Sequence, residues 1–154
     1  MSKTIEQLEG QVWGEPEYDS HVVTNSHRLR KKPIDQFLVE DLRFMIGQNV
    51  GTQYLMPRAL GLLEQNPLVE DYHYPGELLQ SVLHLQEQYW REHPAHLARA
   101  LKVAEFALQK LEEKWAERKA KARQLDGAEL DGKQYPEKLI EEWCKAFIRR
   151  YRVG

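Results

Sequence analysis

Apolar residues recur at three- and four-residue intervals along most of the chain, while alternating strand-like patterns are nearly absent. This spacing predicts an all-α protein, a single-domain bundle of about seven helices. The expected helices cover residues 4–10, 20–31, 37–48, 52–65, 75–83, 95–123 and 136–152. The side chains expected to face inward include Val22, Val23, Leu29, Leu38, Val39, Leu42, Met45, Ile46, Leu78, Leu79, Val82, Leu83, Leu139, Ile140, Trp143, Cys144, Phe147 and Tyr151.

Capping residues and prolines mark several helix ends. Thr4 and Gln7 have the spacing of a capping box, and Gly10 closes the short helix that follows. Pro75 is expected at the first position of its helix. Pro57 falls inside the 52–65 pattern, so it lies either in the first turn or at a kink.

The clearest helix follows Pro94. Its apolar positions are spaced 4, 3, 4, 3 and 4 and form an unbroken a/d stripe: Leu97, Leu101, Ala104, Leu108, Leu111 and Trp115. A helix over 95–123 is about 45 Å long, whereas a domain of this size is about 40 Å across. Either the last two turns project into water or the helix breaks near Trp115. Such a stripe is most often intramolecular core, but it can also seat a homodimer, so monomer and dimer both stay open.

Composition narrows the class of protein. The 154 residues are 42% hydrophobic and 30% charged, which is ordinary globular composition and excludes collagen-like or wholly disordered chains. The single cysteine, Cys144, cannot form an internal disulfide and is expected to be a buried, inert thiol. The N-terminal sequence lacks the apolar core of a signal peptide, and no apolar run is long enough to span a bilayer. We therefore expect a cytoplasmic protein that does not enter a membrane.

Catalytic and metal-binding motifs are absent from the sequence. There is no GxGxxG, HExxH, GxSxG or EF-hand pattern. His93 and His96 are three residues apart, but Pro94 between them and the lack of an acidic third ligand favour capping or exposed histidines. We expect neither an enzyme nor a cofactor or metal site.

Charge is segregated along the chain although its total is only −2. The acidic first half contains one basic run, Arg28, Arg30, Lys31 and Lys32, and the long helix is basic in turn. Internal pairing or solvation of this run is favoured, because no aromatic residues interleave it for base stacking. The alternative function is an α-helical, nucleic-acid-binding regulatory protein that uses this run or the basic helix end.

Two connectors combine carboxylates with aromatic side chains. Such loops suit a basic protein partner, because tyrosines offer contact area and carboxylates steer association; otherwise the rings cover the core and the acids are solvated. The candidate partner-binding residues are Glu15, Glu17, Tyr18 and Asp19 in the first connector, and Glu70, Asp71, Tyr72, His73, Tyr74 and Glu77 in the second.

The order of five motifs resembles a family of bacterial contact-dependent growth inhibition (CDI) immunity proteins. The motifs are WGEP (13–16), HRLRKKP (27–33), VEDLRFMIGQNVG (39–51), YLMPRAL (54–60) and LLEQNPLVEDYHYPGELLQSVL (62–83). The resemblance covers about the first 85 residues of the single domain 1–154. Residues 86–154, with the long helix and the C-terminal helix, are interpreted from their own patterns.

The resemblance implies a small cytoplasmic inhibitor. It would bind and neutralise the C-terminal toxin domain of a large exported effector, which protects the producing cell and its siblings. Toxins of such systems are often nucleases, so the family implies a basic toxin surface that meets an acidic inhibitor. Two mechanisms stay open: the inhibitor plugs the active site of the toxin, or it binds beside that site and blocks substrate entry.

Overall fold

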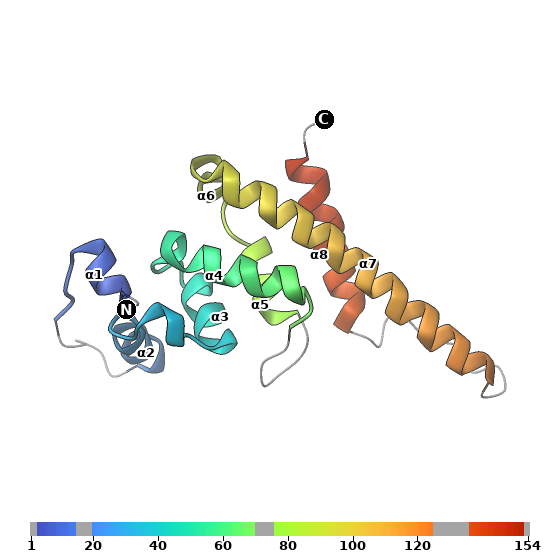
Figure 1. The fold of residues 1–154 in the computed structure, drawn as a ribbon, viewed down its shortest axis with the longest axis horizontal. Helices are drawn as coiled ribbons and strands as arrows, with labels where there is room; N and C mark the ends of the chain where they lie inside the picture. The colour runs from blue at the N-terminus through green and yellow to red at the C-terminus, as the bar shows by residue number, and fades with distance from the viewer. Residues whose placement is uncertain (1–2, 15–19, 70–75, 125–135, 153–154) are drawn as a thin grey trace.

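The computed structural model describes residues 3–14, 20–69, 76–124 and 136–152, and within these ranges the chain is helical with no strand (Figure 1). The expected all-α fold is confirmed. The elements are α1 (Ile5–Glu9), α2 (His21–Arg30), the 3₁₀ turn η1 (Ile34–Gln36), α3 (Val39–Gly47), α4 (Thr52–Gln65), α5 (Glu77–Leu83), α6 (Glu87–Glu92), α7 (Pro94–Gln124) and α8 (Pro136–Tyr151).

Local signals set the first helices as expected. The Thr4 side chain accepts a hydrogen bond from the Gln7 N–H, and the Gln7 side chain accepts one from the Thr4 N–H, so the capping box is confirmed. Gly10 ends α1 with φ +66°. The Ser20 hydroxyl caps α2 by accepting from the Val23 N–H.

Some boundaries and one helix differ from expectation. The sequence pattern missed α6, because its six residues contain one buried apolar side chain, Trp90, which is too few for a periodicity. The expectation that Pro75 opens a helix is wrong. Gly76 is the N-cap and α5 begins at Glu77. Pro57 lies in the second turn of α4, which runs over the expected residues 52–65.

Three side chains expected in the core are exposed: Val22, Leu38 and Leu139. Val22 lies in the first turn of α2, one turn before the buried residues of that helix. Leu38 is the N-cap of α3, so its extended backbone takes it off the helical face. In α8 the buried residues Ile140, Cys144 and Phe147 form a narrower face than expected, and Leu139 falls outside it.

Helix α7 is continuous for 31 residues, so of the two alternatives the projecting helix is the one observed. Figure 1 shows its C-terminal turns extending away from α1–α5. The fully buried face differs slightly from the expected a/d stripe. It is centred on small residues: Ala100, Val103, Ala104, Ala107 and Leu111. The leucines at 97, 101 and 108 are only half-buried beside this face, because α8 and α4 approach α7 over its alanines.

Two glycines mark places where helices approach closely. At Gly51 (φ +64°), a Cβ atom would lie 2.7 Å from Ile5 Cδ1, so α1 is packed directly on the turn before α4. At Gly76 (φ +87°), a Cβ atom would lie 2.6 Å from Ile140 Cδ1, so the start of α5 is packed on α8. Both positions require glycine for two reasons, the backbone conformation and the space.

Candidate partner-binding surface

Nine of the ten candidate residues lie outside the residues that the structure describes: Glu15, Glu17, Tyr18, Asp19, Glu70, Asp71, Tyr72, His73 and Tyr74. The tenth, Glu77, is the first residue of α5 and is only 6% exposed. Its Oε2 lies 3.6 Å from Nε of Arg43 on α3. In this structure the Glu77 carboxylate therefore faces a neighbouring helix rather than solvent, since the start of α5 turns the side chain toward α3.

The residues that follow the two acidic segments both contact α3. His21, just after the first segment, places its ring 6.4 Å from the ring of Phe44 in an edge arrangement. Glu77, just after the second segment, forms its ion pair with Arg43. The described residues that follow the two segments therefore contact consecutive residues of one helix, Arg43 and Phe44.

The upstream end of the first segment is fixed to α2. The guanidinium of Arg30 lies 4.1 Å from the centroid of the Trp13 ring, and the ring of His27 contacts the same indole edge-on at 5.0 Å. Arg30 is fully buried; it donates to Glu9 Oε1 at 2.6 Å and to the carbonyl of Gln11 at 2.9 Å. This network fixes Trp13, two residues before the first acidic segment, against α2.

Three of the four cations of the basic run are paired internally, as the sequence analysis favours, and the fourth, Lys31, is exposed. Arg30 pairs with Glu9, Lys32 lies 2.7 Å from Asp41, and Arg28 lies 3.8 Å from the same carboxylate. Asp41 is 3% exposed and also accepts the Leu38 N–H, so its charge is compensated by cations and by the start of α3. These contacts engage Arg30 and Lys32 closely, whereas Arg28 and Lys31 stay exposed at the surface.

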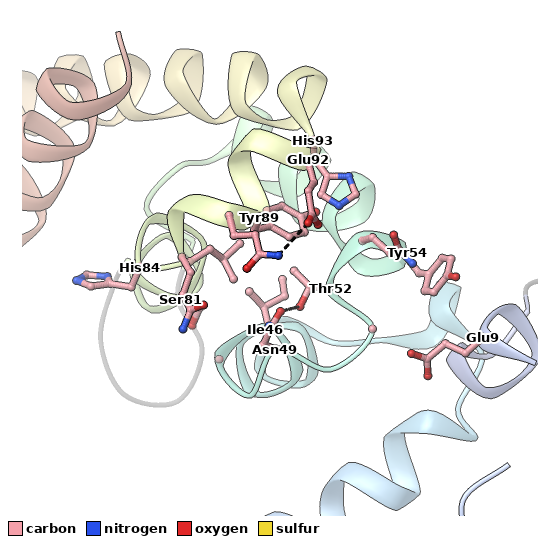
Figure 2. Close-up of a pocket in the computed structure, with 16 residues that line it drawn as sticks. Glu9, Ile46, Asn49, Thr52, Tyr54, Ser81, His84, Tyr89, Glu92 and His93 are labelled. Atoms are coloured by element: carbon pink, nitrogen blue, oxygen red, sulfur yellow. Dashed lines mark hydrogen bonds between the residues drawn. The ribbon is translucent and has the colours of Figure 1, made fainter. Parts of the chain in front are cut away.

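A pocket of about 480 Å³ lies between the α3–α4 turn and α6 (Figure 2). Figure 2 shows Glu9 and Tyr54 at one end and His84 at the other, with Tyr89, Glu92 and His93 along α6. The sequence analysis missed this pocket, because its walls come from segments far apart in the chain: Glu9, Ile46, Gly47, Asn49, Gly51, Thr52, Gln53, Tyr54, Ser81, His84, Leu85, Gln86, Gln88, Tyr89, Glu92 and His93.

Polar side chains of the pocket are mainly bonded to the protein itself. The Ser81 hydroxyl lies 3.2 Å from the carbonyl of Glu77, and Nδ1 of His84 donates to the carbonyl of Gln80 at 2.7 Å. Gln88 donates to Glu92. Ser81 and His84 are thus bonded to backbone rather than to each other, which is not the arrangement of an activated nucleophile and its base.

Tyr89, His93 and His96 stack where α6 meets α7. The Tyr89 hydroxyl is 2.9 Å from Nδ1 of His96, and the two histidine rings are nearly parallel at 5.4 Å. Burial raises the pKa of Tyr89 to about 12, and it lowers the pKa of His96, with smaller contributions from His93 and Arg99. The rings of His93 and His96 are stacked on each other. In the described part of the chain no three His, Cys, Asp or Glu residues converge to hold a metal ion.

A second groove, of about 570 Å³, runs between α7 and α8. Its floor contains Leu111 and Trp115, and its rims carry both lysines and glutamates. On α8, Cys144 is fully buried, so the expected burial of this thiol is confirmed, and burial raises its pKa to about 12.

A comparison with family models matches residues 7–100 to the CDI immunity proteins, about three fifths of the chain. The chain belongs to this family. It is therefore an immunity protein of the toxin-neutralising kind, and its partner is a cognate toxin. The search of curated proteins found no match.

The matched residues of the immunity protein contain the contacts described above. Arg43, Phe44, Glu77 and the whole lining of the Figure 2 pocket lie inside residues 7–100, whereas the α7–α8 groove, which begins at Leu108, lies outside them. Across the described ranges, no helix is both long and apolar enough to cross a membrane.

Proposed function

We propose that this immunity protein neutralises the C-terminal toxin domain of its cognate exported effector by stoichiometric binding, through a surface formed by residues 15–19, residues 70–75 and the face of α3 between their ends. It acts in the cytoplasm of the producing cell and its siblings. The observation that carries the proposal is that His21 and Glu77, which follow the two segments in sequence, both contact α3, at the consecutive residues Phe44 and Arg43. Two segments of the same chemistry, each followed by a contact to one helix, suit a single partner.

The chemistry of the segments favours a basic partner. Residues 15–19 and 70–75 together contain five carboxylates and three tyrosines, and neither stretch contains Lys or Arg. Carboxylates accelerate association with a basic surface, and tyrosines supply contact area at low entropic cost. A nuclease must bind a polyanionic substrate, so its surface is basic. We therefore propose that the neutralised toxin is a nuclease.

The described residues between the two segments fit the edge of such a surface. His21 is exposed and Phe44 is half-buried, so part of an aromatic side chain of α3 is open to a partner beside His21. Arg43 is engaged with Glu77 and therefore adds little repulsion toward a basic partner.

The test reverses charge in the second segment. The double variant Glu70→Lys, Asp71→Lys is titrated with the purified toxin domain by isothermal calorimetry. We expect binding at least about tenfold weaker than that of the wild type, with unchanged thermal unfolding, because two attractive charges become repulsive. An affinity equal to that of the wild type would contradict this placement of the site.

The matched control places the same charge change elsewhere. Glu112 and Glu113 are both exposed on α7, outside the matched residues, so Glu112→Lys, Glu113→Lys tests whether net charge alone weakens binding. We expect this variant to bind as the wild type does at physiological salt. Exposed charges are screened over about 8 Å, and the C-terminal half of α7, which carries both residues, extends away from α3 (Figure 1). Equal weakening by both variants would point to general electrostatics instead of a site.

A separate assay tests whether the neutralised toxin is a nuclease. The toxin domain alone is expected to degrade nucleic acid, and this activity should fall to zero at one equivalent of the immunity protein. If the toxin is neutralised at one equivalent but degrades no nucleic acid, the nuclease part of the proposal is wrong and the binding surface stands. Slower association at higher salt would support the basic partner.

A further inference from the structure

The pocket in Figure 2 is bordered by the C-terminal ends of four helices. The lining residues at these ends are Glu9 of α1, Gly47 of α3, His84 at the C-cap of α5, and Glu92 of α6. The last carbonyls of a helix carry a partial negative charge, which lysine or arginine in the last turn offsets. The last turns of α1, α3 and α5 contain no basic residue, and Arg91 of α6 pairs with Glu87 outside the pocket. The four ends therefore favour a cation between them.

The full charges of the pocket have the same sign. Two carboxylates, Glu9 and Glu92, line the pocket, and among its described lining residues there is no lysine or arginine. The starts of α4 and α6 also border the pocket and carry partial positive charge, but they are two helix ends against four. The pocket therefore attracts cations and repels anions.

Glu92 is the carboxylate that a partner can reach. Buried Arg30 donates to Glu9 Oε1 at 2.6 Å, so much of the Glu9 charge is balanced inside the protein. Glu92 is exposed, and its Oε1 accepts a hydrogen bond of 3.0 Å from the uncharged amide of Gln88. An ionised carboxylate accepts several hydrogen bonds, so Glu92 keeps capacity for a charged donor.

Neutral acceptors complete the surroundings of Glu92. Figure 2 shows Glu92 beside Tyr89 on α6, with Asn49 and Thr52 across the pocket. The Thr52 hydroxyl donates to Asn49 Oδ1 at 2.8 Å, so its own oxygen can accept from a partner. The volume of about 480 Å³ lies within the range of roughly 300–1,000 Å³ that is typical of ligand pockets. One long side chain of a partner therefore fits, and these groups can bond its charged end.

We infer that this pocket receives a cationic side chain, arginine or lysine, of the cognate toxin, with Glu92 as its counter-ion. The whole lining lies within the family-matched residues 7–100. The inference rests on the proposed function for the basic character of the toxin. It places a toxin contact on the ends of α3 and α6, and this contact does not involve residues 15–19 or 70–75.

The first test puts a competing cation into the pocket. Residues 88 and 92 are one turn apart on α6, so in Gln88→Lys the new ammonium group can pair with Glu92 and take the place of the toxin side chain. Affinity for the purified toxin domain is measured by isothermal calorimetry, and unfolding in urea is measured in parallel. We expect binding at least about tenfold weaker, with no loss of stability.

The matched control for this variant is Gln109→Lys, which makes the same charge change at an exposed position of α7 outside the matched residues. It is expected to bind the toxin domain as the wild type does. Equal weakening by Gln88→Lys and Gln109→Lys would overturn the inference, since net charge would then explain the loss.

The second test removes the charge of Glu92 and keeps an oxygen that accepts from Gln88. We expect Glu92→Gln to bind the toxin domain about fivefold more weakly, because a charge-assisted hydrogen bond becomes a neutral one. Its control is Glu142→Gln, at an exposed position of α8, which is expected to keep wild-type affinity. Gln88 and Glu92 are both exposed, so a loss of affinity at constant stability is a readout that a merely structural role would not produce.

Wild-type affinity in Gln88→Lys or in Glu92→Gln would overturn the inference. If both variants bind as the wild type does while the Glu70, Asp71 reversal weakens binding, the pocket is rejected and the proposed surface stands. The opposite pattern would reject the proposed surface and retain the pocket, so the two failures are distinguishable.

Discussion

The family-matched residues 7–100 and the C-terminal helices beyond them are stabilised in different ways. In the matched part, charged side chains are buried and paired over long sequence distances, as in Arg30 with Glu9 and Lys32 with Asp41. Among the C-terminal pairs within one helix, the partners lie three or four residues apart and the lysine side chains are about half exposed, as in Lys110 with Glu113 and Lys145 with Glu141. The first kind of pair fixes one geometry, whereas the second adds little to stability.

This difference indicates where a substitution should lower stability least. The start of α2 depends on the Ser20 cap, and the turn before α4 and the start of α5 each depend on a close contact at a glycine, Gly51 and Gly76. On α7, by contrast, the fully buried face ends at Leu111, and the described side chains of residues 112–121 are half-buried or exposed. A substitution in the matched part should therefore lower the free energy of unfolding more than the same substitution in α7 or α8.

The largest expected effect on stability comes from replacing one arginine by alanine in each of the two regions. Arg30→Ala removes a fully buried guanidinium that bonds Glu9 and Gln11 and stacks on Trp13, and we expect the free energy of unfolding to fall by about 3 kcal/mol. Arg150→Ala removes an exposed arginine that pairs with Glu87, and the expected loss is about 0.5 kcal/mol or less.

Urea unfolding at constant pH measures both losses. If the two arginine variants lose similar stability, the contrast between buried and exposed pairing is wrong for this protein. Far-ultraviolet circular dichroism checks that each variant keeps its helix content before unfolding.

A smaller effect is expected from two glycines of the matched part that share a positive φ. Gly51→Ala combines the strained backbone with a Cβ atom 2.7 Å from Ile5, and we expect a loss of about 2–3 kcal/mol. Gly10→Ala has the same kind of backbone (φ +66°) with no atom within 4 Å of the added Cβ, and the expected loss is about 1 kcal/mol. Thermal unfolding of the two variants separates the steric cost from the backbone cost, and equal melting temperatures would mean that α1 is not tightly packed on the turn.

The smallest expected effect lies at the junction of the two regions, where His96 of α7 meets Tyr89 of α6. The pKa of His96 is lowered from 6.5, chiefly by burial, so the folded protein binds fewer protons at His96 than the unfolded chain does. This contribution to stability is present above pH 6.5 and is lost as the pH falls through the folded pKa. We expect His96→Gln to reduce the loss of stability between about pH 7.5 and 5.5.

Two carboxylates with lowered pKa values, Glu64 and Glu141, do not interfere in this pH range. Hydrogen bonds from Arg99 and Lys145 lower the pKa values of Glu64 and Glu141 below 4.5, so the stability that these two groups contribute is lost only at more acidic pH. Urea unfolding at the two pH values gives the measurement. An identical pH dependence in wild type and His96→Gln would assign the effect to other groups.

Much of the fold could be predicted because its signals are local. The capping box at Thr4 and the 52–65 helix follow from side chains within a few residues of each other. The site was harder to predict. Glu77 belongs by composition to the acidic connector, yet its burial against Arg43 depends on the packing of α5 on α3. The pocket between the α3–α4 turn and α6 left no sequence signal, because its walls are distant in the chain.

The amino-acid sequence by itself determined the helical class, the long α7, the buried Cys144 and the segregation of charge, since each depends on periodicity or on composition along one stretch of chain. Only the tertiary structure decided which charges are buried, that His21 and Glu77 both contact α3, and that Ile140 packs against Gly76. The physical reason is that burial and close contact arise between helices distant in sequence, and their partners are chosen by packing rather than by local propensity.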